Sequence, residues 1–600
     1  MFVQALAAYA DEYLSEEMGS EAWEQKPVPY FIEIGFDGTF LGVVSRSRQE
    51  ARGKATVTIA EPLTVPKTPL KRNSGLHPLL AADDIKYVLG PGRWTSAKDS
   101  DRENASERHR AFVDFIGTAA KATADEALIS CVRFYERDEQ VQRAREELNV
   151  AKAGSFVVLS VGGPVISRLA PRRYWEQHYR DAKERIASGA LVAECLISGR
   201  VGPVAPTHDP IKGLGNVGGQ PAGVALMSFD KAAFRSYGWD QCGNSPVSMD
   251  RAAAYVLALN DLLKSDSRRR TIIGGVAFVY WTKQPADFDP MHFLSAPDVK
   301  SVEALLRFDP EADPDPNEFY LAGLSANGAR VMMRYWMAEP LRKVKANLKE
   351  WIEGLRIVGL NGQGAKTPER WQLYRAIDPD EKWGARRMLP LIRRAVEGRA
   401  KPLGYDMLST VLRYLRHPPE SKGGGETKKQ ELRFTVPRMA LLRLCVNDVI
   451  KGGRAMTEKL DVGQDHPAYL CGRLLAEYEN LQETVYRWAG EAKVNVTIAD
   501  RYYSLASTNP KAAFPKVEAL ARNHFQKLRR DRVQAMIAIE RTVADLHQRI
   551  GAEFPAVLDL DGQGRFALGF YHHKAERNAR IAEFTRQNDS SSDTEKETAE

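Results

Sequence analysis

The sequence predicts an α+β protein, with a mixed α/β N-terminal domain followed by an all-helical C-terminal bundle. Three observations support this fold class. Short β-rich segments alternate with amphipathic helical segments over residues 1–350. From Ala326 onward strand signals almost vanish, and beyond residue 456 apolar residues repeat every three or four positions. The chain has 600 residues, which is too long for a single hydrophobic core.

Changes in composition divide the chain into four predicted regions. Residues 1–350 form the mixed α/β domain, and residues 351–455 form a helical connecting region. Within the latter, the Pro-, Gly- and Lys-rich segment 418–429 predicts a flexible loop. Residues 456–585 form the predicted bundle. The tail, 586–600, is rich in serine and acidic residues, which predicts disorder.

The composition argues against several classes of protein. The net charge of +7 permits a polyanionic partner without requiring one. The five cysteines are far apart and form no Cys-x-x-Cys motif, so neither a zinc ribbon nor a disulfide framework is expected, and a reducing cytoplasm is predicted. No apolar segment approaches the roughly 20 residues that span a bilayer, and the N-terminus lacks a basic signal-peptide region, so no membrane partner is expected.

The N-terminal elements follow from local patterns. Residues 1–14 predict an amphipathic helix. Tyr30–Val44 contains two β-rich segments around Asp37-Gly38, which predicts a hairpin. Residues 93–107 are polar and loop-like, and helical patterns then lead to Phe156–Val161, which predicts a buried strand.

A short basic loop is the first candidate binding site. Lys71 and Arg72 suit phosphates or guanine edges, and they lead into Asn73, Ser74 and Gly75. Asn73 can both donate and accept hydrogen bonds at a base edge. Two interpretations stay open, an ordinary surface turn and a loop that reads nucleic acid.

A Gly-rich segment, Lys212–Gly223, is the second candidate. It contains a G-x-G-x-x-G pattern, but the flanking residues predict neither the strand nor the helix that a dinucleotide site needs. One interpretation is a long turn between strands. The other is a loop whose backbone approaches nucleic acid, with contacts from Lys212, Asn216, Gly218, Gly219 and Gln220.

Two basic clusters also have two interpretations each, a solvated surface and a contact with nucleic-acid phosphates. The first cluster, Arg268, Arg269 and Arg270, precedes Ile272–Trp281, which predicts one buried strand. The second lies in the predicted bundle beside Tyr502 and Tyr503, which suggests tracking of a single strand by charge and stacking. Its residues are Arg522, Lys527, Arg529, Arg530 and Arg532, and the candidate DNA contacts among them are Lys527, Arg529 and Arg530.

Phe319–Val331 predicts a strand followed by a helix, with Ser325 as the N-cap of that helix. The change from mixed α/β to helical structure is predicted near Trp351. Two apolar stripes at helical spacing predict the packing of the bundle. The first stripe comprises Leu470, Leu474, Tyr478, Leu481, Val485 and Trp488, and the second Met536, Ile539, Val543, Leu546 and Ile550.

No catalytic motif emerges from the sequence. The carboxylate pairs Asp83-Asp84 and Asp559/Asp561 suit Mg²⁺, but neither has a recognisable third ligand. The chain contains no Gly-x-Ser-x-Gly and no His-Glu-x-x-His pattern. We therefore expect a protein that is not an enzyme, with no catalytic residue, bound metal or cofactor.

Five blocks, in the same order, resemble the large subunit of the type I-C CRISPR Cascade complex, and the resemblance extends to about Ala582. The blocks are Lys71–Gly90, Lys212–Gly238 with Asn244–Ser248, Phe319–Trp336, Pro467–Gln482 and Asp500–Ser507 with Phe514-Pro515 and His524–Arg529.

The resemblance implies a non-catalytic large subunit of a crRNA-guided antiviral DNA surveillance complex. Such a subunit recognises the protospacer-adjacent motif in duplex DNA and promotes local unwinding and R-loop formation, while crRNA pairing reads the target. The implied partners are crRNA, target DNA, the backbone, crRNA-end and small subunits of Cascade, and a helicase-nuclease recruited in trans. The helical C-terminal module would stabilise the displaced strand. In this family the module is also made separately from an internal start, for which Met456 is well placed.

Within this interpretation, Lys71 and Arg72 would anchor phosphates, and Asn73 and Gln220 would face base edges. Two rival functions remain: a structural RNA-binding scaffold that does not read DNA motifs, and a metal-dependent nuclease.

Overall fold

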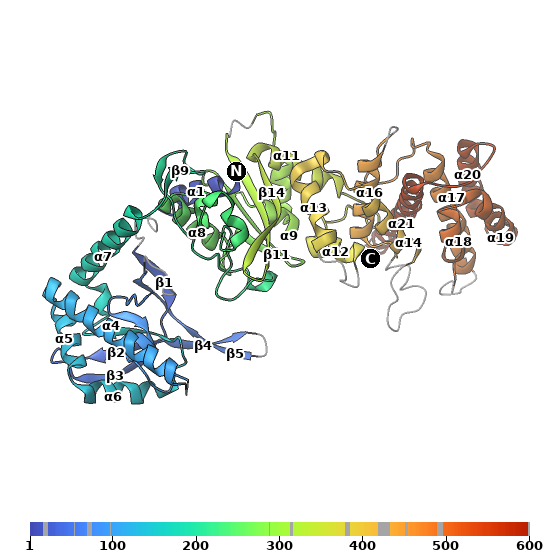
Figure 1. Cartoon of the computed structure of the whole chain (residues 1–600). Coiled ribbons are helices and arrows are strands. Elements are labelled where there is room, and N and C mark those ends of the chain that lie inside the picture. Colours follow the sequence, from blue (N-terminus) through green and yellow to red (C-terminus); the bar gives the residue numbers. More distant parts are fainter. Residues whose placement is uncertain are drawn as a thin grey trace. The chain divides into compact units, whose positions relative to one another are not determined.

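The protein forms two compact units in a computed structural model (Figure 1). Unit 1 comprises Met1–Ile211 and Ala225–Asp261, and unit 2 comprises Lys212–Val224 and Leu262–Glu600. The structure describes residues 1–15, 22–52, 55–68, 75–96, 98–286, 288–312, 316–378, 385–417, 433–450, 454–488 and 496–597.

Unit 1 is organised around a four-stranded sheet in the order β3-β2-β8-β7. β2 (Tyr30–Ile34) pairs antiparallel with β3 (Phe40–Ser45) and parallel with β8 (Phe156–Ser160), which is also antiparallel to β7 (Ala82–Asp84). Every residue of β8 is buried, which confirms the predicted strand. The predicted hairpin is also confirmed, because Gly38 adopts φ +87° in the turn between β2 and β3.

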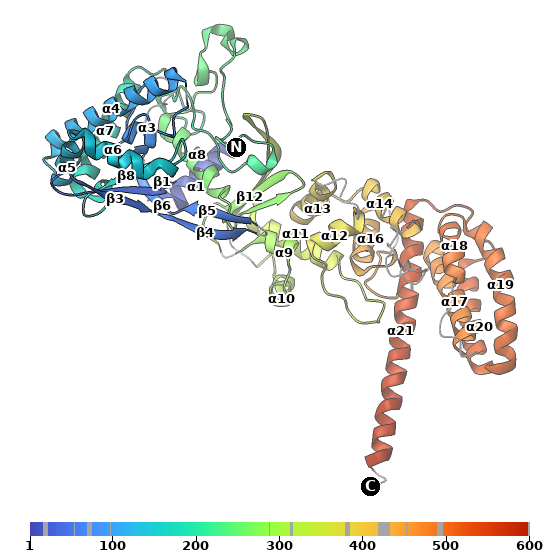
Figure 2. The ribbon, with the colours of Figure 1, turned by 90° about the horizontal axis from the view of Figure 1, so that it is seen from below.

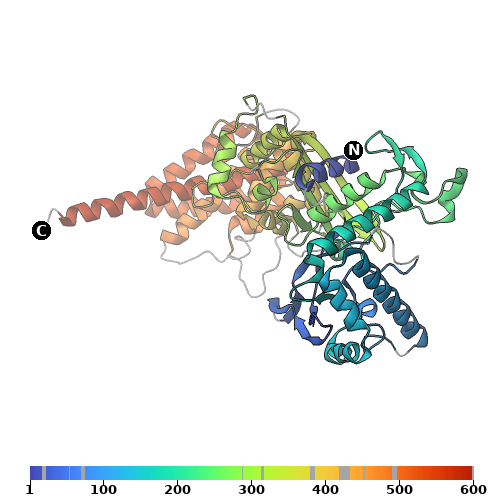
Figure 3. The same ribbon diagram turned by 90° about the vertical axis from the view of Figure 1, so that its left-hand side faces the viewer.

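The helices between Ile85 and Ser188 cover this sheet and bury a common core with it (Figures 1 and 3). The Gln140 side chain of α6 accepts a 2.9 Å hydrogen bond from the Phe40 amide of β3. The helices of unit 1 are α1 (Phe2–Tyr13), α3 (Ile85–Val88), α4 (Asp99–Thr123), α5 (Glu126–Tyr135), α6 (Asp138–Glu147), α7 (Leu169–Ser188) and α8 (Met249–Leu262). Its two-stranded pairs are β1 (Trp23–Pro27) with β6 (Pro62–Pro66), β4 (Ser47–Arg52) with β5 (Ala55–Ala60), and β9 (Val192–Glu194) with β10 (Val201–Pro203).

The prediction of a loop up to residue 107 is wrong, because α4 begins at Asp99. Asp99 and Asp101 stand in its first turn, where carboxylates are stabilised by the positive end of the helix dipole. Asp101 also pairs with Lys86 at 2.7 Å. This hydrogen-bonded pairing lowers the pKa of the Asp101 carboxyl to about 2. The acidic residues at the start of α4 therefore stabilise the N-terminus of a helix, and their polarity does not indicate a loop.

Unit 2 contains an antiparallel sheet in the order β11-β12-β13-β14. Its strands are β11 (Arg270–Ile273), β12 (Val276–Thr282), β13 (Glu318–Asn327) and β14 (Arg330–Pro340). The single strand predicted over Ile272–Trp281 is wrong, because Gly274 and Gly275 adopt positive φ and turn the chain into a hairpin.

The helix predicted after Ser325 is also wrong. Ser325 lies within β13, and the chain turns at Gly328, with φ +57°, into the long strand β14. The Asn327-Gly328 dipeptide is a strong hairpin signal, and aromatic residues of the returning strand favour the pleated conformation.

A single hydrophobic core extends through unit 2, from Ile273 in the sheet to Tyr571 in the last helix. This core includes residues on both sides of positions 350 and 455, and the chain passes from one unit to the other after residues 211, 224 and 261. The helices of unit 2 are α9 (Pro290–Ser295), α10 (Val299–Arg307), α11 (Leu341–Gly354), α12 (Arg370–Ile377), α13 (Ala385–Glu397), α14 (Tyr405–Arg416), α16 (Val436–Val449), α17 (Pro467–Trp488), α18 (Ile498–Ala506), α19 (Pro510–Asp531), α20 (Val533–Ile550) and α21 (Leu560–Glu597).

The two predicted apolar stripes lie on α17 and α20, and their members from Leu470 to Val485 and from Met536 to Ile550 pack in this core. Leu470, Leu474 and Leu546 are fully buried. The chain is helical as far as Glu597, where disorder from residue 586 was predicted. Figure 2 shows the second half of α21 extending past the neighbouring helices. An extension needs no new helix nucleus, because the packed first half supplies one. The predicted loop 418–429 lies outside the described residues.

Among the described helices, none combines the length and apolar character needed to cross a bilayer.

Candidate functional site

The Gly-rich loop Lys212–Gly223 has a backbone that only glycine permits at two positions. Gly213 has φ +84°, and a Cβ there would lie 2.6 Å from the carbonyl oxygen of Leu263. Gly218 has φ +95°, and a Cβ there would lie 2.5 Å from the carbonyl oxygen of Ala326. Both distances are too short for a carbon atom, so a side chain at either position would displace the loop.

Further contacts hold this loop against the sheet of unit 2. Gly219 forms a parallel bridge with Gly328 in the turn between β13 and β14. Leu214 and Val217 are buried. The guanidinium Nη2 of Arg270 donates a 3.0 Å hydrogen bond to the carbonyl oxygen of Gly213. The structure thus brings together two segments that were predicted separately, the Gly-rich loop and the end of the arginine cluster.

The polar side chains of the loop point to solvent. Lys212, Asn216 and Gln220 are all exposed, whereas the backbone between them is packed. A lysine ammonium attracts phosphates, and amide side chains can donate to and accept from base edges. Because the backbone is already ordered, little conformational entropy remains to be lost on binding.

The β13–β14 hairpin that supports the loop was missed by the sequence interpretation. Arg334 on β14 donates through Nε to the Ser325 hydroxyl at 2.8 Å, which ties the two strands together beside the turn. Reading Asn327-Gly328 as a hairpin turn would have revealed this support.

The arginine cluster does not act as one surface. Arg268 is exposed, whereas Arg269 and Arg270 are half-buried. Tyr280 holds the backbone here, since its hydroxyl donates to the Arg268 carbonyl at 2.5 Å and its amide donates to the Arg269 carbonyl at 3.1 Å. Burial raises the pKa of the Tyr280 phenol, which keeps this donor protonated. Arg268 is therefore the member best placed for an external anion, and Arg270 supports the loop.

The second basic cluster occupies the last turns of α19. Lys527, Arg529 and Arg530 are exposed, and Leu528 between them is buried, which fixes the face that carries the charges. Cations near a helix C-terminus are stabilised by the helix dipole. The arrangement suits contact with a phosphate chain.

The suggestion that Tyr503 stacks on a nucleotide is wrong. Only 2% of Tyr503 is exposed, and its ring packs edge-on against Phe434, Phe566 and Phe570. Tyr502 is half-buried against the same core. Stacking by Tyr503 is therefore excluded, whereas stacking by the half-buried Tyr502 and the contacts of the basic residues stay predictions.

The predicted motif-reading residues Lys71, Arg72, Asn73 and Ser74 lie outside the described residues, so their roles stay predictions.

The carboxylate pairs have structural partners. The buried Asp83 accepts from the Leu79 amide at 2.8 Å, and Asp84 caps α3 through the Lys86 amide. Asp559 accepts from the Gly562 amide, and Asp561 pairs with Arg565 at 2.9 Å. Within the described ranges, no cluster of three His, Cys, Asp or Glu side chains has the geometry of a metal site.

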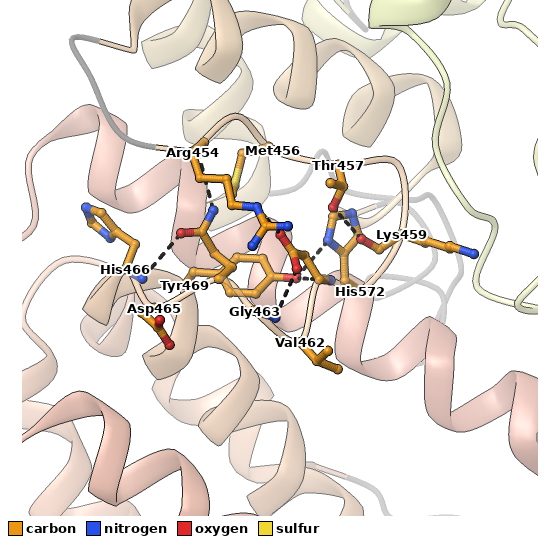
Figure 4. A network of polar contacts seen from close by, with 12 residues as sticks. Arg454, Met456, Thr457, Lys459, Val462, Gly463, Asp465, His466, Tyr469 and His572 are labelled. Carbon is orange, nitrogen blue, oxygen red and sulfur yellow. Dashed lines mark hydrogen bonds and ion pairs between the residues drawn. The ribbon is translucent and has the colours of Figure 1, made fainter.

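The segment around Met456 is tied to the helices on both sides of it. Met456 is buried, and its amide donates to the Asn447 side chain of α16 at 2.7 Å. Figure 4 shows the contacts that follow, in which the Tyr469 hydroxyl accepts from the Asp461 amide and lies 3.1 Å from Nδ1 of His572 on α21. A product that starts at Met456 would keep the contact between α17 and α21 and lose α16. Separate production of this module stays a prediction.

A comparison with protein families matches residues 6–578 to a family described as CRISPR-associated protein (Cas_Csd1). No curated protein matches the chain.

Proposed function

Because the chain belongs to the Cas_Csd1 family of CRISPR-associated proteins, we propose that it is the non-catalytic large subunit of a type I-C Cascade complex. In this role it recognises a protospacer-adjacent motif in duplex DNA, promotes local unwinding, and stabilises the R-loop that crRNA pairing forms. Its partners are crRNA, target DNA, the other Cascade subunits, and a helicase-nuclease that the R-loop recruits.

The fixed Gly-rich loop is the observation that best supports recognition of the protospacer-adjacent motif. Its backbone is held by the contacts of Gly213 and Gly218, and it exposes Lys212, Asn216 and Gln220. A rigid loop with amide side chains can favour one pattern of base-edge donors and acceptors over another. Lys212 supplies a phosphate contact that sets register. In this proposal, Lys71, Arg72 and Asn73 form a second reading element.

The exposed cations of α19 support the second half of the proposal. Lys527, Arg529 and Arg530 attract a displaced strand through its phosphates, independently of its sequence. Arg268 serves a similar backbone contact near the loop.

The test compares binding of the crRNA-loaded complex, with and without this protein, to duplexes that differ only in the base pairs beside the target. We expect this protein to confer a preference among flanks, and Gln220→Ala or Asn73→Ala to remove it. Equal binding of all flanks by the complete complex would make the chain a structural RNA-binding scaffold. Cleavage of DNA by the purified protein with Mg²⁺ would contradict the non-catalytic role.

A further inference from the structure

The segment Phe229–Asn244 of unit 1 carries an aromatic ring that the fold leaves in solvent. The segment contains two short 3-10 helices, η5 (Ala232–Gly238) and η6 (Gln241–Asn244). It appears in green in Figures 2 and 3, projecting from the part of unit 1 that holds α8. Tyr237 is 97% exposed and has φ +69° and ψ +17°.

Two unfavourable features coincide at Tyr237. A residue with a Cβ is strained in the left-handed region, which glycine or asparagine occupies at lower cost. A tyrosine ring is also normally stabilised by burying its apolar surface. Strain at an exposed residue that does not contribute to the core indicates a position held for an external contact.

Packing contacts and a backbone hydrogen bond hold the base of the projection. The rings of Phe229 and Phe234 meet edge to face, with centroids 5.4 Å apart. Cys242 is buried, and its amide donates to the Pro206 carbonyl at 3.2 Å. Trp239 lies against Gly243, where a Cβ would be 3.4 Å from the indole. The tip is therefore carried on a packed support.

The chemistry of the tip fits a nucleobase. At 97% exposure both faces of the Tyr237 ring are open, as stacking between or upon bases requires. Lys231 and Arg235 are exposed on the same segment and would attract the accompanying phosphates. Arg235 pairs with Asp240 at 3.4 Å, a surface ion pair weak enough to yield to a phosphate.

We propose that Tyr237 stacks on an unpaired nucleobase of the target DNA when the R-loop forms. This proposal rests on the proposed function, since it needs the complex to open duplex DNA. It assigns unit 1 a stacking contact that is separate from the Gly-rich loop of unit 2.

The test uses the crRNA-loaded complex and target duplexes that carry the fluorescent adenine analogue 2-aminopurine at successive positions of the displaced strand and the flank. Stacking on an aromatic ring quenches its fluorescence. We expect quenching at one or two neighbouring positions with the unmodified protein. Tyr237→Phe should keep the quenching because it keeps the ring. Tyr237→Asn tolerates the same backbone but lacks the ring, so fluorescence should recover and R-loop lifetime should fall roughly 5- to 150-fold.

Tyr405→Ala is the matched control, since Tyr405 is also exposed, at 43%, and stands at the start of α14. It should leave fluorescence and lifetime unchanged. If no position distinguishes the unmodified protein from Tyr237→Asn, the stacking proposal is wrong. Unchanged fluorescence with reduced cleavage by the helicase-nuclease would assign Tyr237 to a protein contact and also overturn it. Flank preference is measured separately. If it is intact while the stacking test fails, the stacking proposal is wrong and the proposed function is not.

Discussion

The Gly-rich loop and the last turns of α19 both present polar side chains, but they do so in different ways. In the loop, the backbone is fixed by close contacts of Gly213 and Gly218 and by the hydrogen bond from Arg270. On α19, the backbone is helical, and the charges stand at the ends of long, exposed side chains, which are intrinsically flexible. A fixed geometry suits discrimination between base pairs, whereas mobile cations suit neutralisation of phosphates of any sequence.

The largest effect should come from breaking the fixed geometry of the loop. In Gly218→Ala the new methyl group would meet the Ala326 carbonyl at 2.5 Å, in a backbone conformation that alanine rarely adopts. The loop would move, and flank preference should fall by roughly 5- to 150-fold, the worth of a specific base contact. The measurement is the ratio of dissociation constants of the assembled complex for preferred and non-preferred flanks.

Gly215→Ala is the control for this prediction, because a Cβ at Gly215 meets no other atom within 4 Å. Flank preference should stay unchanged in that variant. Equal losses in the two variants would mean that the close approach at Gly218 is not what the loop requires.

The second prediction perturbs the bundle that carries the α19 cations without changing those cations. Burial, aided by the charge of Arg443, lowers the pKa of His572 to about 3. In the unfolded chain this pKa is about 6.5, so between these values the unfolded state binds more protons and stability falls as the pH falls. Between pH 7 and pH 5, protonation of His572 in the unfolded chain should lower the free energy of unfolding by on the order of 2 kcal/mol.

Denaturant unfolding of the protein at several pH values measures this effect. The His572→Gln variant removes the titrating group, so its stability should depend less steeply on pH below 6.5, although it is less stable at pH 7. Identical pH slopes in the two proteins would show that His572 is not the group responsible.

The third prediction separates the two roles assigned to neighbouring arginines. Arg270→Ala removes the donor to the Gly213 carbonyl and should lower flank preference about tenfold, since a hydrogen bond from a charged donor contributes roughly 1.5 kcal/mol. Arg268→Ala should instead weaken binding to every duplex alike, because Arg268 is exposed and would contact only phosphates. The same flank-binding ratios distinguish the variants, and a loss of preference in Arg268→Ala would reverse the assignment.

The smallest effect concerns the mobile cations. Combined Lys527→Glu and Arg530→Glu substitutions should shorten R-loop lifetime severalfold with less effect on initial binding, because they act on the displaced strand. The salt dependence of affinity should become shallower by about one unit of slope for each lost contact. Lys516→Glu, an exposed change earlier on α19, is the control. Unchanged lifetimes at low salt would refute the role of this cluster.

Much of the local structure followed from the sequence alone, because the spacing of apolar residues along a helix or strand shows which side faces the core. The buried strand β8, the Gly38 turn and the apolar faces of α17 and α20 are examples. The family also followed from the order of short blocks, and the match over residues 6–578 agrees with it.

Only the tertiary structure decided the contacts between segments that are far apart in the sequence. Arg270 supports Gly213 across 57 residues, and Ala326 forbids a side chain at Gly218. The sequence alone suggests that Tyr503 is a surface aromatic residue beside basic residues. In the structure, its ring packs against the rings of Phe434 and Phe566. The local sequence pattern leaves both burial and exposure open for a residue such as Tyr503. Long-range packing chooses between the two, since the free energy of burial depends on partners that the neighbouring sequence does not contain.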